Sequence, residues 1–290
     1  MSTGCDRPQI ARVKRAYAGF LRLVPTALAV TLFPLAWLVA STSHSPGIPK
    51  GVRAAEPVET SSSIPVGTVL PVRIESTIAI KDVQPGQVVE AKIAQEVPLP
   101  NREKIRDKSA VRGSIATVEK DTDGAGVRVT LKFSQMEDRK EALTMTTSLR
   151  AIASFSAVRS AQTPLTGPDS GTPSGWADTV QIGGDIRFGD GGTVRNRAKQ
   201  KVGKGVIGGV LVHLRANPAL GCDGPVNGDD HLQALWVFSA DACGAYGLKG
   251  TEIRHTGKSE PVGEITLHFD KDDMKLEGGT AMLLRVVARP

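Results

Sequence analysis

Residues 127–133, with the sequence VRVTLKF, alternate apolar and polar side chains without interruption. Successive side chains of an extended chain point to opposite faces, so the apolar ones gather on one side. The apolar face consists of Val127, Val129, Leu131 and Phe133. Strict alternation over such a length predicts a half-buried β-strand.

Similar short segments, rich in β-branched residues and separated by turn clusters, lie on both sides of this stretch. They are residues 68–74, 87–97, 110–118, 206–214, 234–239, 264–269 and 282–288. Residues 148–161 fit a short helix and a continuing strand equally well. The chain is therefore expected to be mostly β, as a barrel or a sandwich, in one body or as two packed β halves.

Composition divides this region into three parts. Residues 64–160 are expected to form a β domain, and residues 206–290 a second β part. Between them, residues 161–205 begin with eight Gly and three Pro in the first 32 positions. Because so many residues disrupt regular structure there, we expect a Gly/Pro-rich loop or linker.

The N-terminal 63 residues resemble an export signal followed by a tether. A basic segment, residues 1–22, precedes the apolar residues 23–40, and 13 of the 23 residues in 41–63 are Ser, Thr, Pro or Gly. This order is typical of a secretory signal peptide or an uncleaved transmembrane signal-anchor. The chain is thus expected in the cell envelope, exported and then either released into the periplasm or anchored in the inner membrane through residues 23–40.

The net charge of +6 does not predict nucleic-acid binding. Residues 1–40 hold five basic residues and one acid, a net of +4, which leaves only +2 for the other 250 residues. The basicity therefore belongs to the signal segment rather than to a folded surface. No nucleic-acid partner is expected, whereas an envelope glycan, lipid or protein remains open.

One local resemblance supports an envelope location. Residues 64–70 (IPVGTVL), 84–89 (QPGQVV) and 111–115 (VRGSI) resemble the β-module of conjugation and type IV secretion channel proteins, the VirB10/TrbI group. The similarity covers residues 64–133, and residues 105–109 depart from the family's proline-glycine element. The whole chain also resembles exported β-rich bacterial envelope proteins with two cysteines in the C-terminal half. These resemblances imply a location and a fold, and no activity.

No catalytic or cofactor motif stands out in the sequence. Residues 169–173 (DSGTP) imitate a serine-protease loop, but the only preceding histidine is His44, in the tether. No nucleophile elbow, phosphate-binding loop or zinc-ligand spacing occurs, so no cofactor is predicted.

Two clusters are weak candidates for a binding site. Asp229, Asp230 and His231 group acids with an imidazole, as a metal site would. A basic cluster could bind anionic lipid or glycan. Its members are Arg195, Arg197, Lys199, Lys201 and Lys204.

Cysteine usage predicts one disulfide. Cys5 precedes the apolar segment, which leaves Cys222 and Cys243 as an even pair in the exported part. Disulfides form and persist outside the cytoplasm, so we expect these two to be bridged.

These observations together favour an exported envelope protein that acts by binding or within an assembly. An envelope-acting hydrolase with unassigned residues, or a channel component, is the alternative.

Overall fold

The structure is a computed structural model. It describes residues 64–289 apart from 101–102, 123, 125, 166–177, 190–191, 225–230 and 259. Residues 1–63, with the predicted signal and tether, lie outside the described residues. The described elements all belong to one unit, Pro57–Pro290. No helix within them is both long enough and apolar enough to span a membrane.

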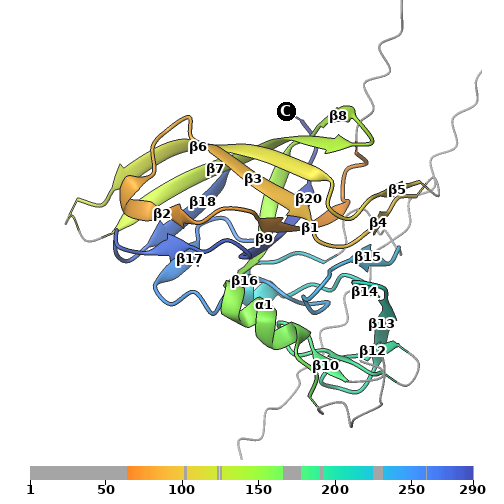
Figure 1. The fold of residues 1–290 in the computed structure, drawn as a ribbon. Coiled ribbons are helices and arrows are strands. Elements are labelled where there is room, and N and C mark those ends of the chain that lie inside the picture. The colour runs from red at the N-terminus through yellow and green to blue at the C-terminus, as the bar shows by residue number, and fades with distance from the viewer. Residues whose placement is uncertain are drawn as a thin grey trace, which may run out of the picture. The chain divides into compact units, whose positions relative to one another are not determined.

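The larger of two main sheets has ten strands (Figure 1). Its hydrogen-bonded order is β16-β9-β20-β1-β3-β6-β7-β18-β17, with β8 added to β7. The strands are β1 (Val69–Ile74), β3 (Val88–Ile93), β6 (Ala110–Lys120), β7 (Val127–Asp138), β8 (Glu141–Thr144), β9 (Thr147–Ala153), β16 (Gly244–Tyr246), β17 (Thr251–Ile253), β18 (Ile265–Phe269) and β20 (Ala281–Val286). All pairs are antiparallel except β16 with β9. In the described residues the order ends at β16 and β17 without pairing them, so the sheet is not a closed barrel.

The smaller sheet has six strands in chain order, β10 to β15. They are β10 (Thr179–Val180), β11 (Ile186–Arg187), β12 (Thr193–Arg195), β13 (Lys201–Val206), β14 (Gly209–Val212) and β15 (Gln233–Ala234). Residues 161–205, expected as a loop or linker, thus carry strands in their described part. Several of these strands have only two residues, too few to produce a readable alternation.

Short elements complete the described fold. Two small ladders pair β2 (Ile78–Ala79) with β19 (Lys275–Leu276), and β4 (Val97–Pro98) with β5 (Lys104–Ile105). The 3₁₀ turns are η1 (Ile80–Asp82) and η3 (Pro218–Leu220). Residues 148–161 fit both a helix and a strand, and they contain both: all of β9 except its first residue, and then all of α1 (Phe155–Gln162) except its last residue. Ser154 separates them because its hydroxyl caps α1 by accepting from the Ala157 N–H at 3.2 Å.

Some strands of the large sheet are buried on one face and others on both faces. The strands buried on both faces are those that the second sheet covers. The predicted apolar face of residues 127–133 is buried, whereas β9 is buried along its whole length. In β20, Met282 and Leu284 join the core of the large sheet, while Ala281 and Leu283 join a second core. That second core also contains residues of α1 and the small sheet. The two sheets are therefore packed across β1, β9 and β20, which supports the mostly β prediction and a layered arrangement.

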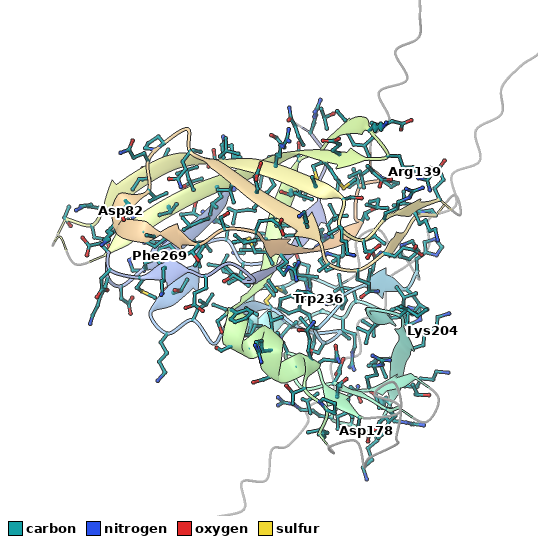
Figure 2. The ribbon with its side chains drawn as sticks, viewed as in Figure 1. Asp82, Arg139, Asp178, Lys204, Trp236 and Phe269 are labelled. Atoms are coloured by element: carbon teal, nitrogen blue, oxygen red, sulfur yellow. A yellow bond between two sulfur atoms is a disulfide. The ribbon has the colours of Figure 1, made fainter. Side chains whose placement is uncertain are left out.

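Residues 234–239, expected as a strand, are buried but form a strand only at Gln233–Ala234. Trp236 has a φ of 55°. A left-handed residue cannot continue a β ladder, so the chain turns away from β14 at this point. Figure 2 labels Trp236 between the two sheets.

Candidate functional site

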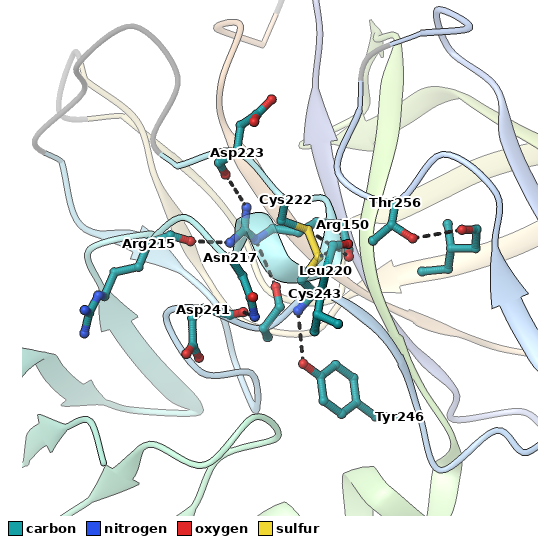
Figure 3. Close-up of a disulfide and its surroundings, with 12 residues drawn as sticks. Arg150, Arg215, Asn217, Leu220, Cys222, Asp223, Asp241, Cys243, Tyr246 and Thr256 are labelled. Carbon is teal, nitrogen blue, oxygen red and sulfur yellow. Dashed lines mark hydrogen bonds between the residues drawn. A yellow bond between two sulfur atoms is a disulfide. The ribbon is translucent and has the colours of Figure 1, made fainter. Parts of the chain in front are cut away.

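The predicted disulfide is confirmed. Cys222 and Cys243 are bridged, with 6.0 Å between their Cα atoms, and both side chains are buried (Figure 3). The bridge joins the loop after η3 to the start of β16. Gly257 packs against it, since a Cβ at that position would lie 2.6 Å from the Cys222 Sγ.

Arg150 is hydrogen-bonded to the loops beside the disulfide (Figure 3). Its side chain is 1% exposed. Nε donates to the Ala242 carbonyl at 3.0 Å, and Nη1 donates to the Asp223 carbonyl at 2.7 Å. Nη2 donates to the carbonyl of Arg215. One guanidinium thus holds three loops, two of them beside the bridged cysteines.

A β-bulge explains how a residue of a buried strand reaches these loops. Leu283 pairs with Ala151 and Leu284 with Leu149, so Arg150 is the extra, unpaired residue of β9. A bulge changes the direction of a side chain relative to the regular pleat. Burial, together with the nearby charge of Arg285, lowers the pKa of Arg150 to about 10. The group stays charged at neutral pH, because that value lies well above 7.

A second buried polar residue attaches the small sheet to the large one. Gln95, which follows β3, is 1% exposed. Its Oε1 accepts from the N–H groups of Val210 and Trp236 at 3.1 and 2.7 Å. Nε2 donates to the Val210 carbonyl at 2.9 Å. The Gln95 amide is therefore hydrogen-bonded to the backbone of β14 next to the residues of β14 that pair with β15.

Three cavities surround the β13–β14 hairpin that is held in this way. Two apolar cavities, of about 550 and 650 Å³, share Pro98 and Leu211 as walls. A smaller one, of about 240 Å³, lies beside Val210, between the end of α1 and strands β10 and β11. We call it the polar pocket. Its walls include Gln162, Thr179, Gln181, Arg187, Gly209 and Trp236.

Two polar atoms distinguish the polar pocket. Gln181 is 4% exposed, and its Nε2 donates to the Thr179 hydroxyl at 3.3 Å. Gln181 Oε1 and Arg187 Nε are both buried, and neither has a hydrogen-bond partner among the described residues. Gly205 makes room for the guanidinium, since a Cβ there would lie 2.5 Å from Arg187 Nε. Buried polar atoms nearly always have partners, so this pair is the strongest indication of a ligand site in the described chain.

The predicted basic cluster does not gather in this pocket. Arg195 donates from Nη1 to the Lys199 carbonyl at 2.9 Å, which closes the turn between β12 and β13. Arg197 donates from Nη2 to the Gly183 carbonyl at 3.2 Å. Lys201 and Lys204 are exposed on β13 (Lys204 is labelled in Figure 2). Two of the five side chains thus serve local backbone structure.

The predicted metal candidates are only partly described. Asp229 and Asp230 lie outside the described residues, and His231 lies on the wall of the 550 Å³ cavity. No group of three or more potential metal ligands occurs among the described residues.

An acid–histidine pair joins the tip of the β6–β7 hairpin to β18. His268 Nε2 lies 2.8 Å from Asp121 Oδ2, and Arg128 Nε donates to Asp121 Oδ1 at 3.2 Å. The hydrogen bond with His268, together with the charges of His268 and Arg128, lowers the pKa of Asp121. The side chain of His268 is 19% exposed. Among the described residues, no serine, threonine or cysteine is hydrogen-bonded to this imidazole.

Sequence reasoning missed the residues that make the polar pocket and its frame. One signal was available for Gln95, which continues the buried positions Val89, Ala91 and Ile93 at a spacing of two. A polar residue on the apolar face of a strand needs a buried partner. Gln181 and Arg187 gave no comparable signal. Comparison of the chain with protein-family models and with curated proteins finds no match.

Proposed function

We propose that this chain is an exported binding protein of the bacterial cell envelope and that its ligand occupies the polar pocket. Residues 1–63 would carry the β-rich unit across the inner membrane, with residues 23–40 either cleaved or kept as an anchor. The observation that carries the binding function is the pair of unpartnered buried atoms, Gln181 Oε1 and Arg187 Nε. A cavity of 240 Å³ is smaller than the ~300–1,000 Å³ pockets that enclose drug-sized ligands. It suits a group the size of one amino-acid or sugar residue.

Binding is favoured over catalysis because the pocket walls combine fixed groups without an activated nucleophile. Gln95 is hydrogen-bonded to Val210 and Trp236, which both line the pocket, and so holds this part of the wall in place. A site that is held in place before binding loses little conformational entropy when the ligand arrives. The disulfide also supports export, since such bonds persist mainly outside the cytoplasm.

The resemblance of residues 64–133 to a secretion-channel β-module also supports an envelope location. Strands β1, β3, β6 and β7 from this stretch are neighbours in the large sheet. A channel subunit would assemble with copies of itself, so the size of the purified full chain in solution separates the two functions. A monomer that binds envelope material supports the binding protein, and a ring-sized assembly contradicts it.

Export is tested by trapping thiols in bacteria that express the full chain. Cells are quenched with an alkylating reagent before lysis, and the modified cysteines are identified by mass. We expect Cys222 and Cys243 to be protected by their bridge. A control with Leu28→Arg and Leu32→Arg should block export and expose both thiols. Alkylation of both cysteines in the unaltered chain would contradict export.

Binding is tested by sedimenting the purified full chain with isolated cell-wall sacculi. We expect the unaltered chain and the surface variant Arg159→Gln to sediment. Arg187→Gln should stay in the supernatant, because it removes the cationic donor of the pocket. Equal sedimentation of Arg187→Gln would exclude the polar pocket as the site, and no sedimentation of any form would contradict binding to the cell wall.

A further inference from the structure

We propose that the polar pocket recognises an α-carboxylate whose α-carbon carries an N–H donor. Such a group is a free amino acid or the C-terminal residue of a peptide chain. This inference rests on the proposed function, because it names the ligand chemistry of the same pocket.

Arg187 supplies the carboxylate half of this recognition. No hydrogen bond or ion pair joins its side chain to any described residue, and its Nε is buried. A guanidinium offers Nε and a neighbouring Nη as two parallel donors, which match the two oxygens of a carboxylate. Gly205 leaves room for the group, since a Cβ at position 205 would lie 2.5 Å from Nε.

Gln181 supplies the other half. Its Nε2 donates to the Thr179 hydroxyl, and Oε1 is the amide atom left without a partner. The free Oε1 can only accept, so it needs a donor on the ligand. A simple anion such as phosphate or acetate would satisfy Arg187 and leave Oε1 unpaired. A ligand with a donor next to its carboxylate satisfies both atoms at once.

The size and lining of the pocket fit a ligand of one amino-acid residue. Val210 and Trp236 provide apolar wall for a short side chain, and the volume is about 240 Å³. The wall contains one formal positive charge, Arg187, and no acid. A single carboxylate therefore meets a complementary charge, and a strongly cationic ligand does not.

Four small-molecule probes test the carboxylate contact and the donor contact separately. Each probe is titrated into the purified full chain, and its binding is measured by saturation-transfer NMR. Alanine and N-acetylalanine carry both groups, propionate lacks the donor, and alaninamide lacks the carboxylate. We expect alanine or N-acetylalanine to bind at least about tenfold more tightly than propionate and alaninamide. Binding of alanine alone identifies a free amino acid as the source, and binding of N-acetylalanine identifies a chain terminus. Equal affinity for all four probes would overturn the proposal.

Two variants assign the contacts. Arg187→Lys keeps the charge but loses the parallel donors, so it should weaken N-acetylalanine binding by about tenfold or more. Gln181→Met keeps the side-chain length without the acceptor, so it should weaken N-acetylalanine and leave propionate unchanged. Arg159→Gln is the matched control outside the pocket. An unchanged affinity of both pocket variants for the probe that the unaltered chain binds, alanine or N-acetylalanine, with the disulfide intact, would refute the assignment.

The two proposals fail separately. If the chain is exported and sediments with sacculi but binds none of the four probes, this inference is wrong and the proposed function stands. If both cysteines are found reduced in cells while the purified chain still binds N-acetylalanine, the ligand class stands and the envelope function is wrong.

Discussion

The side-chain amide of Gln95 is hydrogen-bonded to both backbone groups of Val210. Nε2 donates to the Val210 carbonyl at 2.9 Å, and Oε1 accepts from the Val210 N–H at 3.1 Å. The amide thus pairs with β14 as a neighbouring strand would. Gly209 permits this approach, because a Cβ there would lie 2.1 Å from Oε1. The smaller sheet, whose residues line part of the polar pocket, is thus hydrogen-bonded to a side chain that follows β3 of the larger sheet.

Gln95→Met should therefore destabilise the fold strongly. The substitution leaves the N–H groups of Val210 and Trp236 buried without their partner, and an unpaired buried donor costs about 1–3 kcal/mol. We expect the free energy of unfolding in urea to fall by about 3 kcal/mol. Gln135→Met, at an exposed position of β7, is the control and should change it by less than about 0.5 kcal/mol. Equal effects of the two changes would show that the Gln95 contacts add no stability.

Replacing both Cys222 and Cys243 by alanine should lower the free energy of unfolding by about 3 kcal/mol. The bridge spans a sequence separation of 21 residues, and a loop of that size restricts the unfolded chain by roughly this amount. Chemical denaturation of the oxidised chain and of the double variant measures the difference. Identical midpoints would mean that the bridge does not contribute to stability.

Arg150→Met should be coupled to the loss of the disulfide. Arg150 donates to carbonyls next to both bridged cysteines, at Asp223 and Ala242. Two elements that restrain the same loops are not independent, so a double-mutant cycle should give a coupling free energy of about 0.5–3 kcal/mol. Arg159→Met on the exposed face of α1 should show none. Strict additivity of Arg150→Met with the cysteine changes would contradict a shared role.

Gly257→Ala should disturb the disulfide loop. Gly257 has a φ of 67°, a conformation that costs other residues about 1–2 kcal/mol, and its missing Cβ faces the Cys222 sulfur at 2.6 Å. We expect a loss of about 2 kcal/mol in stability, together with faster reduction of the bridge by dithiothreitol. Gly86→Ala tests backbone strain alone, since its φ is 84° and nothing lies within 4 Å of the new Cβ. A smaller loss for Gly257→Ala than for Gly86→Ala would argue against close packing at the sulfur.

Asp185 should make stability depend on pH. Burial raises the pKa of this carboxyl above 3.8, although its Oδ2 accepts from the Ala240 N–H at 2.8 Å. The folded chain therefore holds its proton to higher pH than the unfolded chain does. As pH rises above 3.8 through the raised pKa, the ionised form becomes costly and stability falls. Asp185→Asn, which keeps an acceptor and cannot ionise, should remove this fall when urea midpoints are measured from pH 4 to 8. An unchanged pH profile would exclude Asp185 as its source.

The amino-acid sequence alone predicts the β character of the chain, the buried face of residues 127–133 and the pairing of Cys222 with Cys243. Those features follow from local alternation, which reports which side of a strand meets the core, and from the even number of cysteines after the apolar segment. The sequence contains one further signal. Residues 281–284 of β20 are all apolar, and such a run is typical of a strand that is covered on both faces.

The partners of the buried polar side chains could not be predicted from the sequence, because they depend on how the chain packs. Arg150 reaches carbonyls 65 to 92 residues away because a bulge redirects it, and Gln95 reaches Val210 across 115 residues. Gln181 and Arg187 become walls of one pocket only because strands too short to show any periodicity pair beside α1 and β14. Hydrogen-bond partners at such separations depend on how two sheets pack, and the alternation of a single strand carries no record of that packing.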